Sequence, residues 1–235
     1  MNKNNVWFIT AKTNMHVGNE NTSSYGLIDL AVQRNATTGL PCINSSSLKG
    51  ALNEYAAMQA QNLDLVKIFG CDKKDKSKET QKGQYTFFDA NILFLPVQDD
   101  SDLYHLETSH DIIKRFRNQM SLFGIQLNND DDALLAELKN CLGINKDVKF
   151  SEKDEDFIDL CSDDNLPIIA RNVLENGESK NLWYEQVVPA ETVFYTLIDD
   201  KEDGKLFGEL SKSNAIVQIG ANATIGYGYC KFTNL

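Results

Sequence analysis

Apolar and polar positions follow one another along the chain in blocks that predict a mixture of strands and helices. Residues 6–16 form an apolar, strand-like run, and residues 46–61 have the composition of a helix that begins after a serine cluster. Two short β-prone segments, residues 85–88 and 92–97, are separated by Asp-Ala-Asn and are predicted as the arms of a hairpin. The N-terminal part therefore predicts a strand, a helix and a strand pair.

The rest of the chain continues this alternation. Residues 109–123 repeat apolar side chains at helical spacing, and residues 130–142 form a second helical pattern that begins with aspartates, which favour a helix start. The remaining predicted elements are three strands and one short helix, at residues 192–198, 215–219 and 227–232 and around Phe207 and Leu210. These elements make two β-α-β passes around inserted material. The sequence therefore predicts an α+β fold with a ferredoxin-like, RRM-like core.

Composition limits the class of protein. A chain of 235 residues with 42% hydrophobic residues can bury the core of one domain with insertions. It contains no 18-residue apolar run and no signal-peptide pattern, so we expect a soluble cytoplasmic protein without membrane contacts. The five cysteines are widely spaced and include no C-x-x-C pair. Neither a zinc site nor a disulfide framework is indicated.

Three serines, Ser45, Ser46 and Ser47, stand at the predicted start of the first helix, and Lys49 follows them. Serine side chains cap the free N–H groups of a helix start, and these groups together with the helix dipole also attract anions. With the charge of Lys49 they describe a phosphate-binding site. The alternative is a plain serine cap beside a surface lysine, and these residues alone leave both interpretations open.

A glycine-rich segment, residues 218–232, reads Q-I-G-A-N-A-T-I-G-Y-G-Y-C-K-F. Gly220, Gly226 and Gly228 allow the backbone to approach another chain closely. The last eight residues, 225–232, depart at only two positions from the RNA-contacting signature of RNA-recognition motifs, so the tyrosines are candidates for base stacking. The alternative is a last strand of the fold with a glycine turn before it.

Five segments carry a resemblance to a known family. They are T-N-M-H-V-G (13–18), L-I-D-L-A-V-Q-R-N-A-T-T-G-L-P (27–41), S-S-S-L-K-G (45–50), the segment around L-W-Y-E-Q (169–195) and I-G-A-N-A-T-I-G-Y-G (219–228). In this order the chain resembles the RAMP superfamily of CRISPR-associated proteins, specifically the Cas7-type backbone subunits of type III-B (Cmr) effector complexes. The D-L-x-x-Q-R element favours this subfamily over its type III-A counterpart. Each glycine motif alone is weak, whereas the ordered set is specific.

The resemblance implies a function in RNA-guided defence. Copies of the subunit are expected to stack along a guide crRNA together with other Cmr subunits, and each copy cuts the paired target RNA with the aspartate of the L-I-D-L element, here Asp29. The 2′-hydroxyl of the target is the expected nucleophile, with a divalent metal, Mg²⁺ or Mn²⁺, held at Asp29. His16 and Glu185 are further catalytic candidates. His16 has the alternative of a polar surface group, and Glu185 that of a partner for a basic neighbouring subunit.

The same resemblance suggests residues for RNA binding. Arg34 is a candidate for guide-phosphate contact because its planar fork matches phosphate oxygens. The other candidates are Ser45, Ser46, Ser47, Lys49, Gly220, Asn222 and Gly226. Trp183 and Tyr184 are interpreted as packing residues.

A single Cas7-type RAMP domain is expected over residues 1–235, with insertions around residues 61–165 and a thumb hairpin around residues 170–186. The turn at residues 175–178, E-N-G-E, is the expected tip of this thumb. In such subunits the thumb intrudes between guide and target. Two departures from the family pattern are Asn44-Ser45 in place of Pro-Gly and a chain that is short for the subfamily.

The net charge of −11 is unusual for an RNA-binding protein, but it is unevenly distributed. Residues 1–60 hold four Lys and Arg against three Asp and Glu, net +1, whereas residues 61–165 hold thirteen against twenty-two, net −9. The remaining residues hold six against nine, net −3. The acidic excess therefore lies outside the candidate RNA motifs, and we interpret its runs as solvated faces.

Three functions stay open on the sequence. The favoured one is a guide-bound backbone subunit that is also a metal-dependent endoribonuclease. The second is a structural RAMP subunit that binds guide without cutting, and the third is a stand-alone single-strand RNA-binding domain. Asp29 separates the first two, and the ordered motifs outside residues 225–232 separate both from the third.

Overall fold

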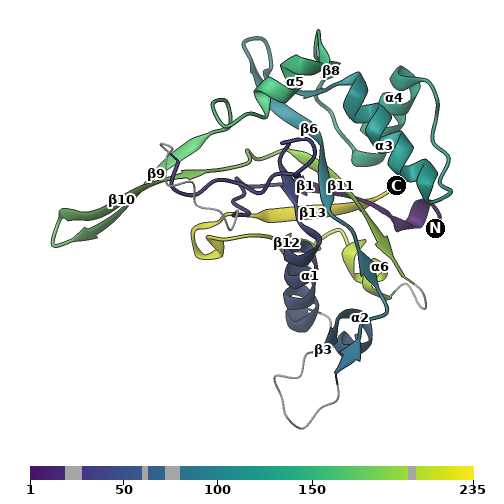
Figure 1. The fold of residues 1–235 in the computed structure, drawn as a ribbon, viewed down its shortest axis with the longest axis horizontal. Coiled ribbons are helices and arrows are strands. Elements are labelled where there is room, and N and C mark those ends of the chain that lie inside the picture. Colours follow the sequence, from purple (N-terminus) through teal and green to yellow (C-terminus); the bar gives the residue numbers. More distant parts are fainter. Residues whose placement is uncertain (19–27, 60–62, 72–79, 201–204) are drawn as a thin grey trace.

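The computed structural model describes residues 1–18, 28–59, 63–71, 80–200 and 205–235 of the chain (Figure 1). Four strands form the centre of the main sheet in the order β13-β1-β11-β6, and every neighbouring pair is antiparallel. The core elements in chain order are β1 (Val6–Ala11), α1 (Ser45–Gln59), β6 (Ala90–Asp99), β11 (Val193–Asp199), α6 (Lys205–Leu210) and β13 (Tyr229–Asn234). Two β-α-β passes with this strand order make a ferredoxin-like core, which confirms the predicted α+β class.

Further strands widen this sheet. They are β12 (Ile216–Gln218) beside β13, then β7 (Leu103–Thr108) and β8 (Val148–Phe150) beyond β6, with β2 (Cys42–Ile43) paired to β6 and β5 (Thr86–Phe87) paired to β11. The predicted hairpin of residues 85–97 is wrong, because β6 forms its hairpin with β7 instead. β5 pairs with the end of β11, where Phe87 lies opposite Ile198, and the Phe87 ring stacks on Phe69 at 5.5 Å.

Helices cover both faces of the sheet. Trp7 and Phe8 are consecutive in β1 and point to opposite faces: the Trp7 ring lies 5.3 Å from Phe207 of α6, and Phe8 lies 6.0 Å from Phe116. Phe116 belongs to α3 (His110–Leu122), which packs with α4 (Asp131–Leu142). An RNA-recognition motif stacks bases on an open sheet face, and here that face is part of the core. The RRM-like run, residues 225–232, therefore supplies the buried strand β13, and the strand interpretation is confirmed.

The observed ends of α3 and α4 agree with the two helices predicted at residues 109–123 and 130–142. Ser109 caps α3 by accepting from the Ile112 N–H, and Asp130 caps α4 by accepting from the Ala133 N–H. Gly143 ends α4 with a left-handed backbone at φ 63°. Predicted and observed boundaries agree closely because the capping residues fix them.

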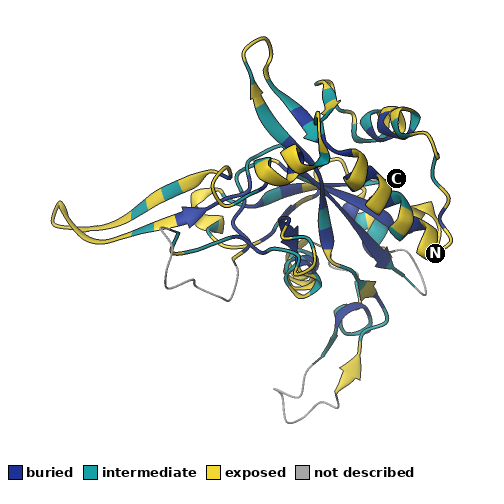
Figure 2. Cartoon of the chain, turned by 45° about the horizontal axis from the view of Figure 1, so that its top comes forward, coloured by how far each residue is buried: buried dark blue, intermediate teal, exposed yellow. Residues whose placement is uncertain are grey.

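A long hairpin stands away from the body of the molecule and is exposed along most of its length (Figures 1 and 2). It consists of β9 (Ile168–Glu175) and β10 (Glu178–Gln186), and its tip is the predicted E-N-G-E turn. Asn176 and Gly177 have φ of 53° and 85°, the left-handed values that a tight two-residue hairpin turn needs. The hairpin thus lies where the thumb is expected.

The region of residues 61–165 contributes strand β6 to the central sheet as well as inserted elements. The elements not yet named are η1 (Lys3–Asn5), α2 (Leu65–Phe69), β3 (Gly70–Cys71), β4 (Gln81–Lys82), α5 (Asp154–Leu160) and η2 (Ala223–Ile225). Among the helices that the structure describes, none has the length and apolar character needed to cross a membrane.

Candidate functional site

Asp29 is tied to the base of the β9–β10 hairpin. Its Oδ2 accepts the Tyr184 N–H at 2.7 Å, and its own N–H donates to the Tyr184 carbonyl at 3.0 Å. The next residue, Leu30, pairs with Glu185 in a parallel bridge. The Asp29 side chain is exposed, so a carboxylate of fixed direction faces the surface beside the hairpin. Leu27, part of the apolar frame expected around it, lies outside the described residues.

Glu185 joins the hairpin to the glycine-rich segment. It is only 1% exposed, and its carboxylate accepts from Arg171 Nε at 3.0 Å and from the Asn222 side-chain amide. The Arg171 guanidinium also lies over the Tyr227 ring, 4.6 Å from its centroid. The basic partner of Glu185 is therefore in its own chain, and the predicted pairing with a neighbouring subunit is not needed to satisfy it.

His16 is buried, so its interpretation as a surface group is wrong. Its Nδ1 lies 2.7 Å from the Gln186 carbonyl oxygen and 3.6 Å from Glu185 Oε1. A carbonyl only accepts, so Nδ1 carries the proton in this bond, and Nε2 is unprotonated in a neutral ring. His16, Glu185 and Asn222 thus meet at one place although they are far apart in the sequence. Their burial suits a role in positioning the hairpin base.

Gly220 allows the glycine-rich segment to pass directly over this cluster. Its φ is 89°, and a Cβ there would lie 2.2 Å from the His16 carbonyl oxygen, which already accepts the Ala221 N–H at 2.8 Å. Gly226 also has a positive φ, 85°, but faces open space. The predicted close approach is therefore present at Gly220, and the backbone that approaches belongs to the same chain.

The start of α1 differs from the predicted serine cap. Ser45, Ser46 and Ser47 lie inside the first turn, and the Ser45 N–H donates to Asp89 Oδ1 at 2.7 Å. A carboxylate of the chain thus occupies the position where an anion was expected. The Ser47 hydroxyl accepts from a glutamine side chain at 3.1 Å, whereas Ser46 and Lys49 are exposed.

Arg34 makes contacts within the protein on several sides. Its guanidinium pairs with Asp163 at 2.7 Å and donates to the carbonyl oxygens of Gly39 and Cys161, each at 2.8 Å. Burial raises the pKa of the neighbouring Cys161 thiol to about 12, with the Arg34 charge opposing the shift. The role of Arg34 as a guide-phosphate contact stays a prediction, and it requires phosphate to replace Asp163.

The donor set at Asp29 fits a divalent metal only in part. Within the part of the chain that the structure describes, no group of three or more His, Cys, Asp and Glu side chains could hold an ion. Asp29 would be a single protein ligand. Mg²⁺ is often bound by one or two carboxylates together with substrate phosphates and water. A metal here would therefore depend on RNA for most of its ligands.

Sequence reasoning missed several residues of this site. Arg171 and Gln186 were not singled out, because each acts through a partner that is distant in the chain. Tyr227 was considered only as a base-stacking candidate, whereas the structure places the Arg171 guanidinium over its ring. Trp183 and Tyr184 were expected to pack rather than to stack on bases. Trp183 is half-buried and Tyr184 is 40% exposed, and both lie on the projecting hairpin.

The fold and the ordered motifs define a class of protein. The family model of the RAMP superfamily matches residues 8–231, nearly the whole chain. The chain belongs to the RAMP superfamily. A more particular relative is the CRISPR system Cmr endoribonuclease Cmr4 of Pyrococcus furiosus, which is 29% identical over 88% of both chains.

Solved structures share the same fold. The crystal structure of oligomeric Cmr4 from Pyrococcus furiosus superposes with a TM-score of 0.71 at 22% identity, covering 97% of this chain and 96% of that one. A chain of the type III-B Cmr-beta complex bound to cognate target RNA gives 0.70 at 20% identity, covering 97% and 95%. At these identities the likeness concerns the fold, including the elements that surround the core.

Proposed function

We propose that this chain is a backbone subunit of a type III-B CRISPR effector complex, which binds guide crRNA and cleaves the paired target RNA. Three observations support this proposal. The Pyrococcus furiosus Cmr endoribonuclease matches this chain over 88% of both chains. The family motifs occur in order, and a hairpin projects from the body of the molecule at the position of the expected thumb. Copies of the chain would lie side by side along the guide, with other Cmr subunits completing the complex.

Asp29 would be the residue that acts on the target. The proposed reaction is a transesterification in which the target 2′-hydroxyl loses its proton and attacks the adjacent phosphorus. The bond to the 5′-oxygen breaks, and that oxygen takes up a proton. The products are a cyclic phosphate and a 5′-hydroxyl end. One carboxylate suffices because the substrate supplies the nucleophile.

A divalent cation, Mg²⁺ or Mn²⁺, is proposed as the cofactor, with Asp29 as its protein ligand. When bound it would stabilise the charge that develops on the phosphate oxygens. The chain's own contribution is the direction of Asp29, which two backbone hydrogen bonds to Tyr184 hold against β10. His16 and Glu185 would act by keeping this strand in place.

The observation that carries the proposal is the exposed Asp29 carboxylate at the hairpin base. Acids that only cap a turn usually bond to the backbone within a few residues. Asp29 instead bonds to Tyr184, 155 positions away, and this contact fixes its position relative to the hairpin that is expected to meet the RNA. Such a position suits a group that meets a phosphodiester beside the hairpin.

The test is Asp29→Ala in the reconstituted complex. We expect complex assembly and target binding to persist while cleavage of a labelled target falls by roughly a hundredfold or more, because the carboxylate acts on the transition state. Asp132→Ala, an exposed acid on α4, is the control and should cut normally. Unchanged products from Asp29→Ala would remove it from this role and leave a structural, non-cutting subunit.

A further inference from the structure

Gln186 is the last residue of strand β10 and is completely buried, with 0% of its surface exposed. Burial of an amide side chain is unfavourable unless its polar atoms find partners within the protein. The Gln186 backbone N–H and C=O and its side-chain Oε1 and Nε2 all have such a partner, and the four partners belong to four different residues. Gln186 therefore joins several segments of the chain at one point.

The backbone of Gln186 binds the segments on both sides of its strand. Its N–H donates to the Leu30 carbonyl oxygen at 2.9 Å, next to the two hydrogen bonds that tie Asp29 to Tyr184. Its carbonyl oxygen accepts from His16 Nδ1 at 2.7 Å. The segments that carry Asp29 and His16 are therefore both held by the end of β10.

The side chain of Gln186 extends this pairing beyond the reach of its backbone. Leu30 still pairs with β10, whereas Val32 pairs with Gly18 in an antiparallel bridge, so the segment after Asp29 leaves β10 within two residues. Gln186 Oε1 accepts the Val32 N–H at 3.2 Å. Because Val32 is only 1% exposed, water would be a poor substitute for this acceptor.

The amide nitrogen of the same side chain binds a further segment. Gln186 Nε2 donates to Asp163 Oδ1 at 3.1 Å, and this oxygen also lies 2.7 Å from the Arg34 guanidinium. A backbone N–H can only donate and an ionised carboxylate can only accept. The side chain between Val32 and Asp163 must therefore offer an acceptor at one end and a donor at the other, as a glutamine amide does.

We propose that Gln186 is a positioning residue for RNA cleavage, which fixes the direction of the Asp29 carboxylate by holding residues 30–32 against β10 and Asp163. This inference rests on the proposed function, which gives Asp29 its role. Asp29 is exposed, so the direction of its carboxylate depends on how the backbone beside it is held. A displacement of about 1 Å can cost roughly a hundredfold in rate. Gln186 is buried and acts without touching the RNA.

The first variant is Gln186→Met in the reconstituted complex, which keeps the length of the side chain and removes both of its hydrogen bonds. We expect the cleavage rate at saturating target RNA to fall by roughly tenfold to a hundredfold, while the target concentration that gives half the maximal rate stays within about twofold of wild type. Gln119→Met is the control. It removes the hydrogen bond that the Tyr195 hydroxyl donates to Gln119 on α3, far from the hairpin in Figure 1, and should cut as wild type does.

A second pair of variants provides the test if Gln186→Met does not assemble. Gln186→Glu keeps an acceptor for the Val32 N–H but places a second carboxylate against Asp163, and it should cut slowly. Adding Asp163→Asn supplies a donor to the new carboxylate and should restore most of the rate.

If Gln186→Met cuts like Gln119→Met, or if the double variant cuts no faster than Gln186→Glu, the inference is wrong. A higher target concentration for half the maximal rate, with the maximal rate unchanged, would also contradict it, because Gln186 would then affect RNA binding. The proposed function survives each of these results if wild-type cleavage depends on Asp29. It falls separately if the wild-type complex shows no guided cleavage.

Discussion

At the residue scale, burial separates the candidate groups into two kinds. Asp29 is exposed and can reach a ligand, whereas His16 and Glu185 are buried and satisfied by partners within the chain. A buried carboxylate that accepts from Arg171 and Asn222 is costly to disturb, because losing one partner leaves charge unpaired in the interior. These residues therefore hold together the surface on which Asp29 acts.

Gly220 allows a direct test of how tightly this surface is held. Gly220→Ala should destabilise the chain by about 2 kcal/mol more than Gly226→Ala, because both variants strain a positive φ but only the first places a methyl group against the His16 carbonyl. Urea denaturation of both variants measures the difference. Equal losses of stability would mean that the segment shifts freely over His16.

At the element scale, the helices α3 and α4 close the second face of the sheet. Phe116 of α3 packs at 4.7 Å from Tyr195 and 6.0 Å from Phe8, so the sheet surface is occupied by protein. Burial raises the pKa of the Tyr195 hydroxyl to about 12. The β9–β10 hairpin, by contrast, is exposed along most of its length (Figure 2). RNA would therefore contact the hairpin and the surface near its base, and not the face of the sheet.

Asp131 links these two helices and gives their docking a pH dependence. Hydrogen bonds from Arg117 and then His110 hold the pKa of Asp131 below its usual range. A lowered folded-state pKa means that its stabilisation is present above the unfolded pKa, about 3.9, and is lost as pH falls through the folded value.

Asp131→Asn should therefore lower the melting temperature at neutral pH, and its difference from wild type should shrink as the pH falls below the unfolded pKa of about 3.9. Asp132→Asn, an exposed neighbour in the same turn, is the control and should differ little from wild type at either pH. Thermal melts at several pH values test this. A constant gap between Asp131→Asn and wild type down to strongly acidic pH would contradict the assignment.

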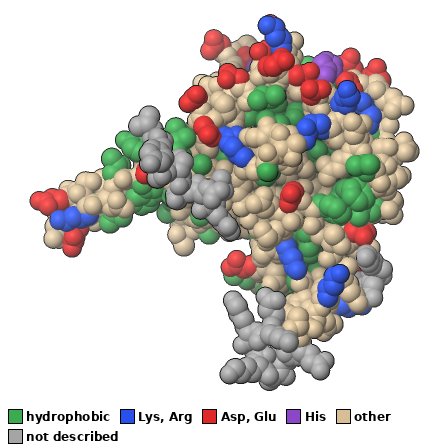
Figure 3. All heavy atoms as spheres, in the orientation of Figure 1, with side chains coloured by type: hydrophobic (Ala, Val, Ile, Leu, Met, Phe, Trp, Pro, Cys, Tyr) green, Lys and Arg blue, Asp and Glu red, His purple; other side chains and the backbone are tan. Residues whose placement is uncertain are grey.

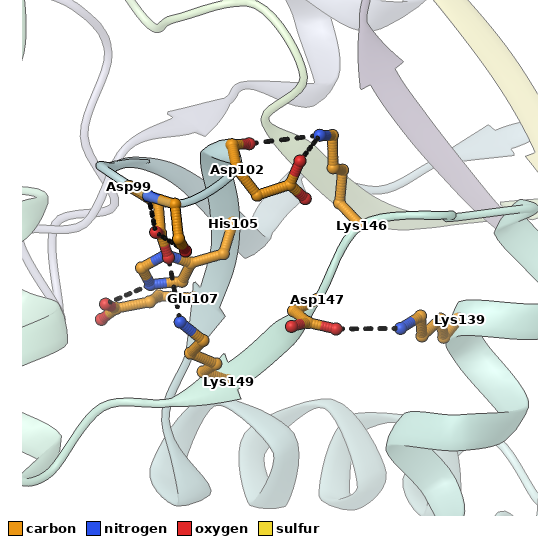
Figure 4. A network of polar contacts seen from close by, with 9 residues as sticks. Asp99, Asp102, His105, Glu107, Lys139, Lys146, Asp147 and Lys149 are labelled. Carbon is orange, nitrogen blue, oxygen red and sulfur yellow. Dashed lines mark hydrogen bonds and ion pairs between the residues drawn. The ribbon is translucent and has the colours of Figure 1, made fainter.

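At the scale of the whole molecule, carboxylates are concentrated at the upper edge of the molecule in Figure 3, where several lysines and arginines lie among them. Some of the acidic groups are satisfied locally (Figure 4): His105 lies between Asp99 at 3.0 Å and Glu107 at 2.9 Å, and Lys149 pairs with Asp99 at 3.1 Å. Hydrogen bonds from Ser101 and Lys149 hold the pKa of Asp99 well below its usual range.

The isolated chain should consequently bind single-stranded RNA weakly, and much better within the guide-containing complex. The acidic edge repels RNA, and a single copy offers only a short positive surface. Affinities of the lone chain and of the assembled complex at matched salt make the comparison. Tight, guide-independent binding by the lone chain would instead favour a self-sufficient RNA-binding domain.

The sequence by itself determined the fold class and many of its elements. Capping residues such as Ser109, Asp130 and Gly143 mark helix ends locally, and E-N-G-E marks a hairpin turn by backbone preference. The sequence also nominated Asp29, because it lies in a short motif of a family with ordered landmarks, and its role stays a prediction. Signals of this kind depend on neighbours in the chain.

Only the tertiary structure decided which distant residues meet. Arg171 and Asn222 converge on Glu185, Asp89 occupies the start of α1, and β5 pairs with β11, because packing and charge pairing act between segments that carry no mark of each other. The same holds for Lys49 and Lys82, which line one groove beside α1 although 33 positions separate them. Local sequence preferences determine which helices and strands form. Contacts between distant segments determine which residues share a surface, and the candidate sites lie on such surfaces.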